Sequence, residues 1–355
     1  MKYSINLDPA EEVLDGRNLD QLIKLYLERC RADPHVLSQT VTGYANALAY
    51  FREWWREVGP WFGWELTEAR LGEYGEWLAQ AKTQYGKPVS YNYQKCCLTR
   101  LKQCFGWASE KHIPRDIARW VPTPIGSAPL RQRASLDDLA ALMAAAGGSG
   151  CPTRDQAYVA LLIGTGLRKM EAANLDIPDV RMNGDRAGTA TVQAKRVKGR
   201  SVQSRVVAFD RWTGHYLAPL LGSYQQPAGP VFRSDDGLRR LSAMAAYRLV
   251  KGAIERAGLE GVIQGPHDLR RNFASWFSQQ HRGEVYGSLL SKQLGHAQFT
   301  MTDKYILQSA DDLAAVIESP LAQHMPVQAA AERETRVAVS FGLQQGRRKR
   351  FPDLD

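Results

Sequence analysis

Two arginine motifs in the second half of the chain contain side chains suited to chemistry on a phosphate. Arg168 follows a Gly-rich bend in GTGLRKMEAANL, where a helix start would direct free N–H groups and a guanidinium toward one anion. Glu171, three residues on, shares the helix face of Arg168 and could hold its guanidinium in place. His267 and Arg270, in HDLRR, also share a helix face, which suits phosphodiester binding and proton transfer beside it. Taken alone, each motif is more simply explained as incidental surface side chains.

A tyrosine lies nine residues after a histidine in LGHAQFTMTDKY, residues 294–305. Tyr305 could be a nucleophile or only a packing residue. Tyrosine fills 14 of 355 positions, so a Tyr at one chosen offset is expected about 4% of the time, and His296 with Tyr305 is weak evidence alone. A phenol has a pKa near ~10, so attack at neutral pH would need a nearby base or cationic phosphate site.

A basic turn, KRVKGR at residues 195–200, separates TATVQA from SRVVAF, two stretches typical of short β-strands. A lysine in such a turn could reach a site as a point charge and donate a proton, because its pKa falls readily near other cations. Turns of this composition are also commonly just solvated or bound to phosphates.

Other chemistries find little support in the sequence. There is no GxxxxGK[ST] loop, no HExxH, no GxGxxG after a strand, no GxSxG and no DxD-like carboxylate cluster. The five cysteines are an odd number without a CxxC pair, which predicts reduced, mostly buried thiols rather than a zinc site or disulfides. We therefore expect no cofactor and no metal.

Length and charge indicate a two-domain protein with a polyanionic partner. A chain of 355 residues can bury two cores. The net charge of +9 favours nucleic acid. No apolar run approaches the ~20 residues that span a bilayer, and the start of the chain is too acidic for a signal peptide. We expect the protein in the cytoplasm.

Hydrophobic periodicity predicts four helices within residues 19–111, with Ser38 as the N-cap of the second, Thr67 as the cap of the third and Ser90 opening the fourth. Beyond Ser135 the sequence predicts two helices separated by Gly164-Thr165-Gly166, then the two strands, then a long helical run. Helix caps are predicted at Ser135, Asp210 and Ser242. The predicted division is an extension at 1–17, a helical domain at 18–112, a Pro- and Arg-rich linker at 113–134, a second domain at 135–320 and a tail at 321–355.

The order of these motifs resembles that of the tyrosine recombinases, the phage-integrase family. The motifs are GTGLR, a lysine-bearing β-hairpin, HDLR, LGH and a tyrosine nine residues past that histidine. The match covers most of residues 135–318 and is far more specific than any single motif. The resemblance implies a mainly α fold with a small β-sheet or hairpin in the catalytic domain. It also implies a two-domain DNA clamp, with an N-terminal four-helix core-binding domain and an integrase-type catalytic domain.

The resemblance also implies roles for individual residues. Arg168 and Arg270 would neutralise the scissile phosphate and its transition state. His267 would be the general acid/base, His296 would hydrogen-bond a phosphate oxygen, and Tyr305 would be the nucleophile that forms a 3′-phosphotyrosyl intermediate. Glu171 would be a supporting residue.

The lysine of the hairpin is expected to protonate the leaving 5′ oxygen. Lys195 follows directly from the strand TATVQA, as the family's lysine follows its own strand, whereas Lys198 resembles the Lys-Gly form of relatives with shorter turns. Lys195 is the preferred assignment and Lys198 the alternative. Candidate DNA contacts, mostly to phosphate, are Lys95, Arg100, Lys102, Arg131 and Arg133.

The partners implied are double-stranded DNA recombination sites, with a homotetramer on two sites. A monomer in solution and accessory DNA-bending or partner recombinase proteins also stay open. In relatives a short helix after the nucleophile passes to the neighbouring protomer, and SADDLAAVIESPL, residues 309–321, is the corresponding segment. The alternatives are a type IB topoisomerase that nicks and reseals one duplex, and a DNA-binding relative that has lost catalysis. HDLR, LGH and the nine-residue spacing favour the recombinase.

Overall fold

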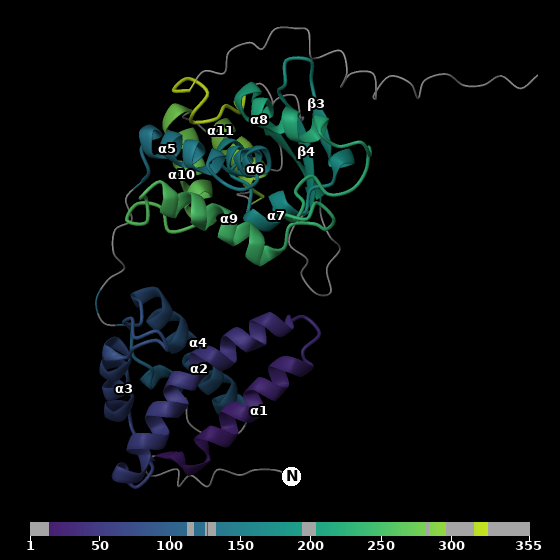
Figure 1. Cartoon of the computed structure of the whole chain (residues 1–355). Coiled ribbons are helices and arrows are strands. Elements are labelled where there is room, and N and C mark those ends of the chain that lie inside the picture. The colour runs from purple at the N-terminus through teal and green to yellow at the C-terminus, as the bar shows by residue number, and fades with distance from the viewer. Residues whose placement is uncertain are drawn as a thin grey trace, which may run out of the picture. The chain divides into compact units, whose positions relative to one another are not determined.

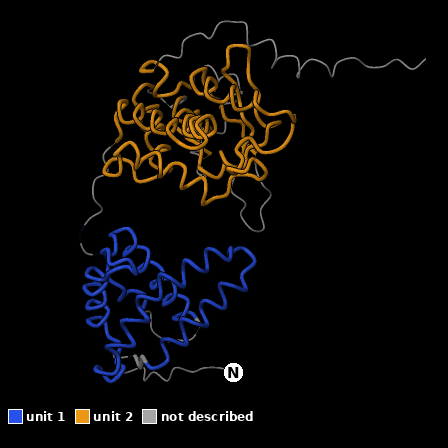
Figure 2. Tube along the Cα trace, in the orientation of Figure 1, with its two compact units in different colours: residues 1–130, 196–201 blue, residues 131–195, 202–355 orange. Residues whose placement is uncertain are grey.

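The computed structural model describes residues 14–111, 117–124, 126, 133–193, 204–281, 284–295 and 316–325. These residues fall into two compact units, one before residue 131 and one after it (Figure 2). Each unit has its own hydrophobic core. The domain boundaries given above stay predictions.

The first unit is built from four helices: α1 (Leu19–Ala32), α2 (Ser38–Val58), α3 (Glu68–Gln80) and α4 (Tyr91–Lys111) (Figure 1). Short elements complete it: β1 (Leu14–Asp15) pairs with β2 (Glu65–Leu66), and single 3-10 turns occupy Gly16–Asn18, Gly59–Phe62 and Ile117–Trp120. Phe51 is the aromatic centre of the core, because its ring contacts those of Trp54, Tyr74 and Phe105 at centroid distances of 5.1 to 5.9 Å. The predicted four helices are present.

The caps of these helices follow local side-chain chemistry. Thr67 accepts a hydrogen bond from the Arg70 N–H at 3.3 Å, and Ser90 accepts one from the Tyr93 N–H at 3.3 Å. The prediction for Ser38 is off by one residue, because α2 begins at Ser38 itself and Leu37 is its N-cap.

The second unit contains α5 (Leu136–Gly147), α6 (Pro152–Thr165), α7 (Lys169–Ala173), α8 (Arg211–Gly222), α9 (Ala243–Arg256), α10 (Pro266–Gln280) and α11 (Glu284–Leu294). Every residue of α6 from Ala157 to Thr165 is buried, as expected of a helix that is apolar on all sides. Helices α5, α8 and α10 pack around α6 (Figure 1). The predicted caps Ser135, Asp210 and Ser242 each accept the expected backbone hydrogen bond.

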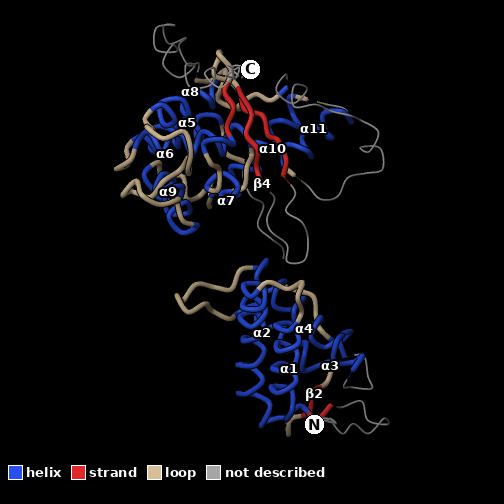
Figure 3. Tube along the Cα trace, turned by 90° about the vertical axis from the view of Figure 1, so that its right-hand side faces the viewer, coloured by secondary structure: helices blue, strands red, loops and turns tan. Residues whose placement is uncertain are grey.

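A three-stranded antiparallel sheet lies beside these helices, in the order β3 (Val180–Met182), β4 (Gly188–Gln193) and β5 (Ser204–Phe209) (Figure 3). The two predicted strands correspond to β4, which begins one residue earlier than expected, and β5. Strand β3, which follows a 3-10 turn at Ile177–Asp179, is missing from the prediction because three residues are too few to show an alternating pattern. The predicted class, mainly α with a small sheet, is confirmed.

Residues 316–325 fold back onto the second unit. Ile317 and Leu321 are buried in its cores, and the Ser319 N–H donates to the Asp210 carboxylate at 2.7 Å. Most of the predicted exchange helix at 309–321 lies outside the described residues. In the described part only Val316 is helical, so the helix predicted over residues 317–321 is absent there.

The remaining sequence predictions concern thiols and membranes. All five cysteines are free, and Cys30, Cys97 and Cys104 are buried, as predicted. Within the described ranges, none of the helices has both the length and the apolar character needed to cross a membrane.

Candidate active site

The corner between α6 and α7 positions Arg168. Helix α6 ends at Gly166, whose φ is +65°, and a Cβ there would lie 2.5 Å from the Phe273 ring and 2.8 Å from Leu294 Cδ2. Both the left-handed backbone and the close packing therefore require glycine. Two residues after Gly166, Arg168 is the N-cap of α7, which begins directly after it.

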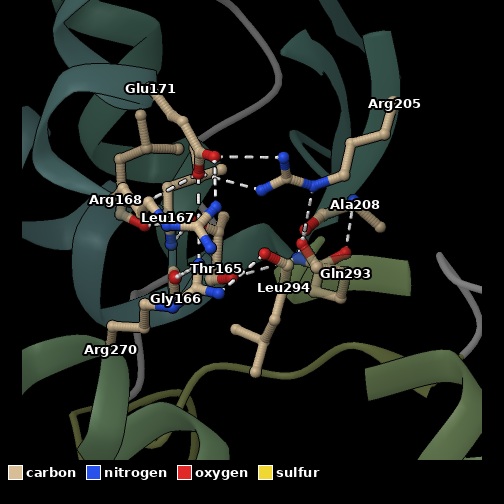
Figure 4. A network of polar contacts seen from close by, with 11 residues as sticks. Thr165, Gly166, Leu167, Arg168, Glu171, Arg205, Ala208, Arg270, Gln293 and Leu294 are labelled. Atoms are coloured by element: carbon tan, nitrogen blue, oxygen red, sulfur yellow. Dashed lines mark hydrogen bonds and ion pairs between the residues drawn. The ribbon is translucent and has the colours of Figure 1, made fainter. Parts of the chain in front are cut away.

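Glu171 is the centre of the polar network in Figure 4. Its carboxylate accepts hydrogen bonds from Arg168 Nη1 at 2.8 Å and from the Arg168 N–H at 3.0 Å. Arg205 in β5 donates to both oxygens, from Nη1 at 3.1 Å and from Nη2 at 2.9 Å. The ion pair predicted from the Arg168–Glu171 spacing is therefore present.

Burial and hydrogen bonding act on the Glu171 carboxyl in opposite directions. The side chain is only 5% exposed, and this burial acts to raise its pKa. The hydrogen bonds and charge of Arg205, together with those of Arg168, outweigh burial and hold the pKa of Glu171 below its ordinary value. Glu171 is an anion that arginines hold in place.

Arg270 reaches the same corner from α10. Its Nη1 donates to the Gly166 carbonyl at 3.0 Å, and its Nη2 donates to the Leu294 carbonyl at 2.7 Å. Nη1 also lies 4.0 Å from a Glu171 oxygen. Burial, followed by repulsion from Arg168, lowers the pKa of Arg270 to about 10, so the group stays protonated at neutral pH.

The cluster carries more positive than negative charge. Arg168, Arg205 and Arg270 surround the single carboxylate of Glu171, which leaves three positive charges against one negative charge among these four side chains. The Arg168 side chain is 43% exposed, whereas those of Arg205 and Arg270 are 16% and 5% exposed. The arrangement suits a phosphate that approaches from the Arg168 side, because the buried cations gain from an added anion.

His267 lies at the start of α10, three residues before Arg270, and is exposed. Desolvation of its ring, followed by the positive charge of Arg270, lowers the pKa of His267. The imidazole is therefore neutral at pH 7 and can accept a proton.

The end of α11 is fixed against the same corner. Gln293 is fully buried, and its amide nitrogen donates to the Ala208 carbonyl at 2.9 Å and to the Thr165 carbonyl at 3.3 Å. Gly295 then ends the helix with a φ of +67°, and its N–H donates to the Ser291 carbonyl at 2.8 Å. This is the Leu-Gly step that precedes His296.

The structure thus brings together Arg168, Glu171 and Arg270, and places His267 on the same helix as Arg270. Five predicted site residues lie outside the described residues: Lys195, Lys198, His296, Tyr305 and Arg131. Their roles stay predictions. No group of three or more His, Cys, Asp or Glu side chains suited to a metal occurs in the part of the chain that the structure describes.

The predicted DNA contacts that are described differ in their surroundings. Lys95 and Lys102 are exposed on α4. Arg100 donates to Gln103 at 2.6 Å and lies over the Tyr44 ring at 4.2 Å, and Arg133 donates to Gln279. The two lysines are freer to contact phosphates than the two arginines, and all four remain predictions.

Arg205 and Gln293 are members of the network that the sequence did not reveal. The pattern of SRVVAF predicts only a strand, and the partners of Arg205 lie 34 residues earlier and 88 residues later. One signal was present, because a charged residue in a short apolar strand usually needs a partner.

The fold and the cluster define a class of protein: a mainly helical domain with a small sheet and a cationic cluster suited to an anion such as phosphate. A sequence model described as "Phage integrase family" matches residues 132–311. The chain belongs to this family.

Sequence relatives agree with that assignment. Tyrosine recombinase XerD of Mycobacterium tuberculosis (strain ATCC 25618 / H37Rv) is 29% identical over 311 residues, which cover 82% of this chain and 94% of the relative. Tyrosine recombinase XerC of Proteus mirabilis is 30% identical over 228 residues, covering 62% of this chain and 69% of the relative.

Two solved structures share the fold. A lambda integrase dimer bound to a COC' core site has a TM-score of 0.59 at 18% identity, covering 83% of this chain and 77% of that chain. The XerH site-specific recombinase bound to palindromic difH substrate has a TM-score of 0.60 at 17% identity, covering 91% and 98%. The protein is a tyrosine recombinase, an enzyme of site-specific DNA recombination by strand cleavage and rejoining, as the motifs predicted.

Proposed function

We propose that Tyr305 attacks a DNA phosphate bound by Arg168 and Arg270, and that the resulting 3′-phosphotyrosyl intermediate carries the strand to its new partner. The observation that supports this most strongly is the cluster of three arginines around Glu171, with its excess of positive charge beside the exposed Arg168 guanidinium. Such preorganised cations stabilise the extra charge of a pentacoordinate phosphate.

The reaction balances without an external energy source. The Tyr305 oxygen forms a bond to phosphorus while the bond to the 5′ oxygen breaks, and His267 takes the phenol proton. Lys195, or Lys198 as the alternative, gives a proton to the leaving 5′ oxygen. A 5′ hydroxyl from a second strand then attacks the phosphotyrosine, which restores the phenol. One phosphodiester replaces another of similar energy.

The assembly proposed is a homotetramer on two DNA recombination sites. It is supported by relatives of the same fold, among them a lambda integrase tetramer bound to a Holliday junction, with a TM-score of 0.58 at 17% identity. The identity of the two DNA sites in the tetramer would determine whether the outcome is integration, excision or resolution of mobile DNA.

The exchange of residues 309–321 between protomers is part of this proposal and needs a careful test. Deletion from Ser309 onward should abolish synapsis, but it also removes Ile317 and Leu321 from the cores of the second unit. Leu313→Asp, which retains both residues, is the cleaner variant. We expect it to prevent tetramer formation on DNA in sedimentation measurements, and wild-type tetramers would count against exchange.

The function is tested by incubating the full chain with DNA fragments from the flanks of its own gene. We expect a covalent protein–DNA adduct with the wild-type chain and none with Tyr305→Phe. Tyr85→Phe is the matched control, because Tyr85 is 80% exposed and lies in the first unit. An adduct with Tyr305→Phe equal to that of the wild type would disprove the assignment of the nucleophile.

A further inference from the structure

We propose that Arg205 is a positioning residue for DNA cleavage, which holds Glu171 and the end of α11 so that Arg168 and Arg270 meet the same phosphate. This inference rests on the proposed function. Arg205 would not touch the DNA, and its effect would pass through the residues it binds.

The hydrogen bonds of Arg205 point into the protein. Nη1 and Nη2 donate to the two oxygens of Glu171 in a bidentate pair, and Nε donates to the Gln293 carbonyl at 3.2 Å. All three guanidinium nitrogens are therefore used, and the side chain is only 16% exposed. Arg168, by contrast, is 43% exposed and is the more available of the two for a phosphate.

Arg205 is connected to Arg168 through Glu171, and to Arg270 through the backbone at the end of α11. Glu171 binds both Arg205 and Arg168, so the carboxylate transmits the position of β5 to the guanidinium of Arg168 (Figure 4). Gln293, whose carbonyl accepts from Arg205, precedes Leu294, whose carbonyl accepts from Arg270 at 2.7 Å. The end of α11 is thus held by Arg205 and by Arg270 at adjacent residues.

Gly295 gives independent evidence that this contact is tightly built. A Cβ at Gly295 would lie 2.7 Å from both Cζ and Nη1 of Arg205. The guanidinium therefore packs directly against the glycine that precedes His296. Any larger residue would displace either Arg205 or the turn after α11.

Removal of Arg205 should disturb the site more than it disturbs the fold. Glu171 would lose two of its hydrogen bonds while still buried, and would draw more strongly on Arg168. A shift of about 1 Å in a positioning group can cost on the order of 10²-fold in rate. Arg205→Lys would keep the charge but lose the bidentate geometry.

The experiment uses the full chain and a DNA substrate that traps the covalent adduct, with single-turnover cleavage and DNA affinity measured separately. For Arg205→Ala we expect cleavage about 100-fold slower, with DNA affinity within about threefold and an unfolding transition that stays cooperative but moves to lower urea. Arg205→Lys should restore part of the rate. Arg181→Ala is the matched control, because Arg181 is an exposed arginine on β3 of the same sheet.

A wild-type cleavage rate in Arg205→Ala would overturn the inference, as would a rate loss explained fully by weaker DNA binding. If Arg205→Ala fails to fold, Arg205→Lys takes its place, because lysine keeps the charge and loses the bidentate geometry. Slower cleavage at unchanged affinity would again support the inference, and an unchanged rate would overturn it. Tyr305→Phe is measured on the same substrate. Loss of the adduct in that variant tests the proposed function independently of the role of Arg205.

Discussion

Gln293 in α11 pairs its side-chain amide with both backbone groups of Ala208 in β5. The Ala208 N–H donates to Gln293 Oε1 at 3.0 Å, and Gln293 Nε2 donates to the Ala208 carbonyl at 2.9 Å. Strand β5 is at the edge of its sheet, so the amide occupies the place that a further strand would take. These two hydrogen bonds fix the position of helix α11 relative to strand β5.

Replacement of Gln293 by leucine should destabilise the second unit. The backbone groups of Ala208 would be left buried without partners, and each such group costs about 1–3 kcal/mol. We expect the free energy of unfolding of this unit to fall by roughly 2–6 kcal/mol in urea titrations. Gln264→Leu is the control, because the Gln264 side chain is exposed. Equal stability of the two variants would show that the amide is dispensable.

Gly166→Ala tests the corner that positions Arg168. The methyl group would meet the Phe273 ring at 2.5 Å, and φ is +65°. A left-handed non-glycine residue costs about 1–3 kcal/mol, and overpacking adds about 1–3 kcal/mol. The urea midpoint should fall accordingly, whereas Gly184→Ala, which has open space at its Cβ, should leave it nearly unchanged. A midpoint unaffected by Gly166→Ala would contradict the packing described.

Arg270→Lys tests whether Arg270 both holds the backbone of the corner and binds the phosphate. Lysine cannot donate to the Gly166 and Leu294 carbonyls with the geometry of a guanidinium, so both the corner and the phosphate site lose alignment. We expect cleavage to slow on the order of 10²–10³-fold, as for loss of one preorganised transition-state donor. Single-turnover adduct formation measures this, and a change in DNA affinity alone would refute the role in cleavage.

The pH dependence of cleavage tests His267. Desolvation and the charge of Arg270, with smaller effects from Arg271 and Arg168, outweigh the opposing charge of Asp268 and place the pKa of His267 below the ordinary value. As a base it is active when neutral, so the rate should be constant near pH 7 and fall as the pH drops through this lowered pKa. His267→Gln should cleave more slowly and lose this acidic limb. A limb that persists in His267→Gln would assign it to another group.

Local chemistry made much of the fold predictable. The caps Ser135, Asp210 and Ser242 are predictable because a cap acts on an N–H only three residues away. Glu171 is predictable as a partner of Arg168 for the same reason. Arg205 is not predictable, because its partners lie in distant elements and no spacing within SRVVAF encodes them. The Gln293–Ala208 pairing was hidden in the same way, since it spans 85 residues.

The central claim is that Tyr305 becomes bonded to DNA, and peptide mapping of the trapped adduct tests it most directly. The adduct formed on DNA from the flanks of the gene would be digested with nuclease and trypsin, and the nucleotide-bearing peptide identified by mass spectrometry. The account predicts a nucleotide linked through its 3′ phosphate to the peptide that contains Tyr305. A nucleotide on any other peptide, or a linkage through a 5′ phosphate, would contradict it.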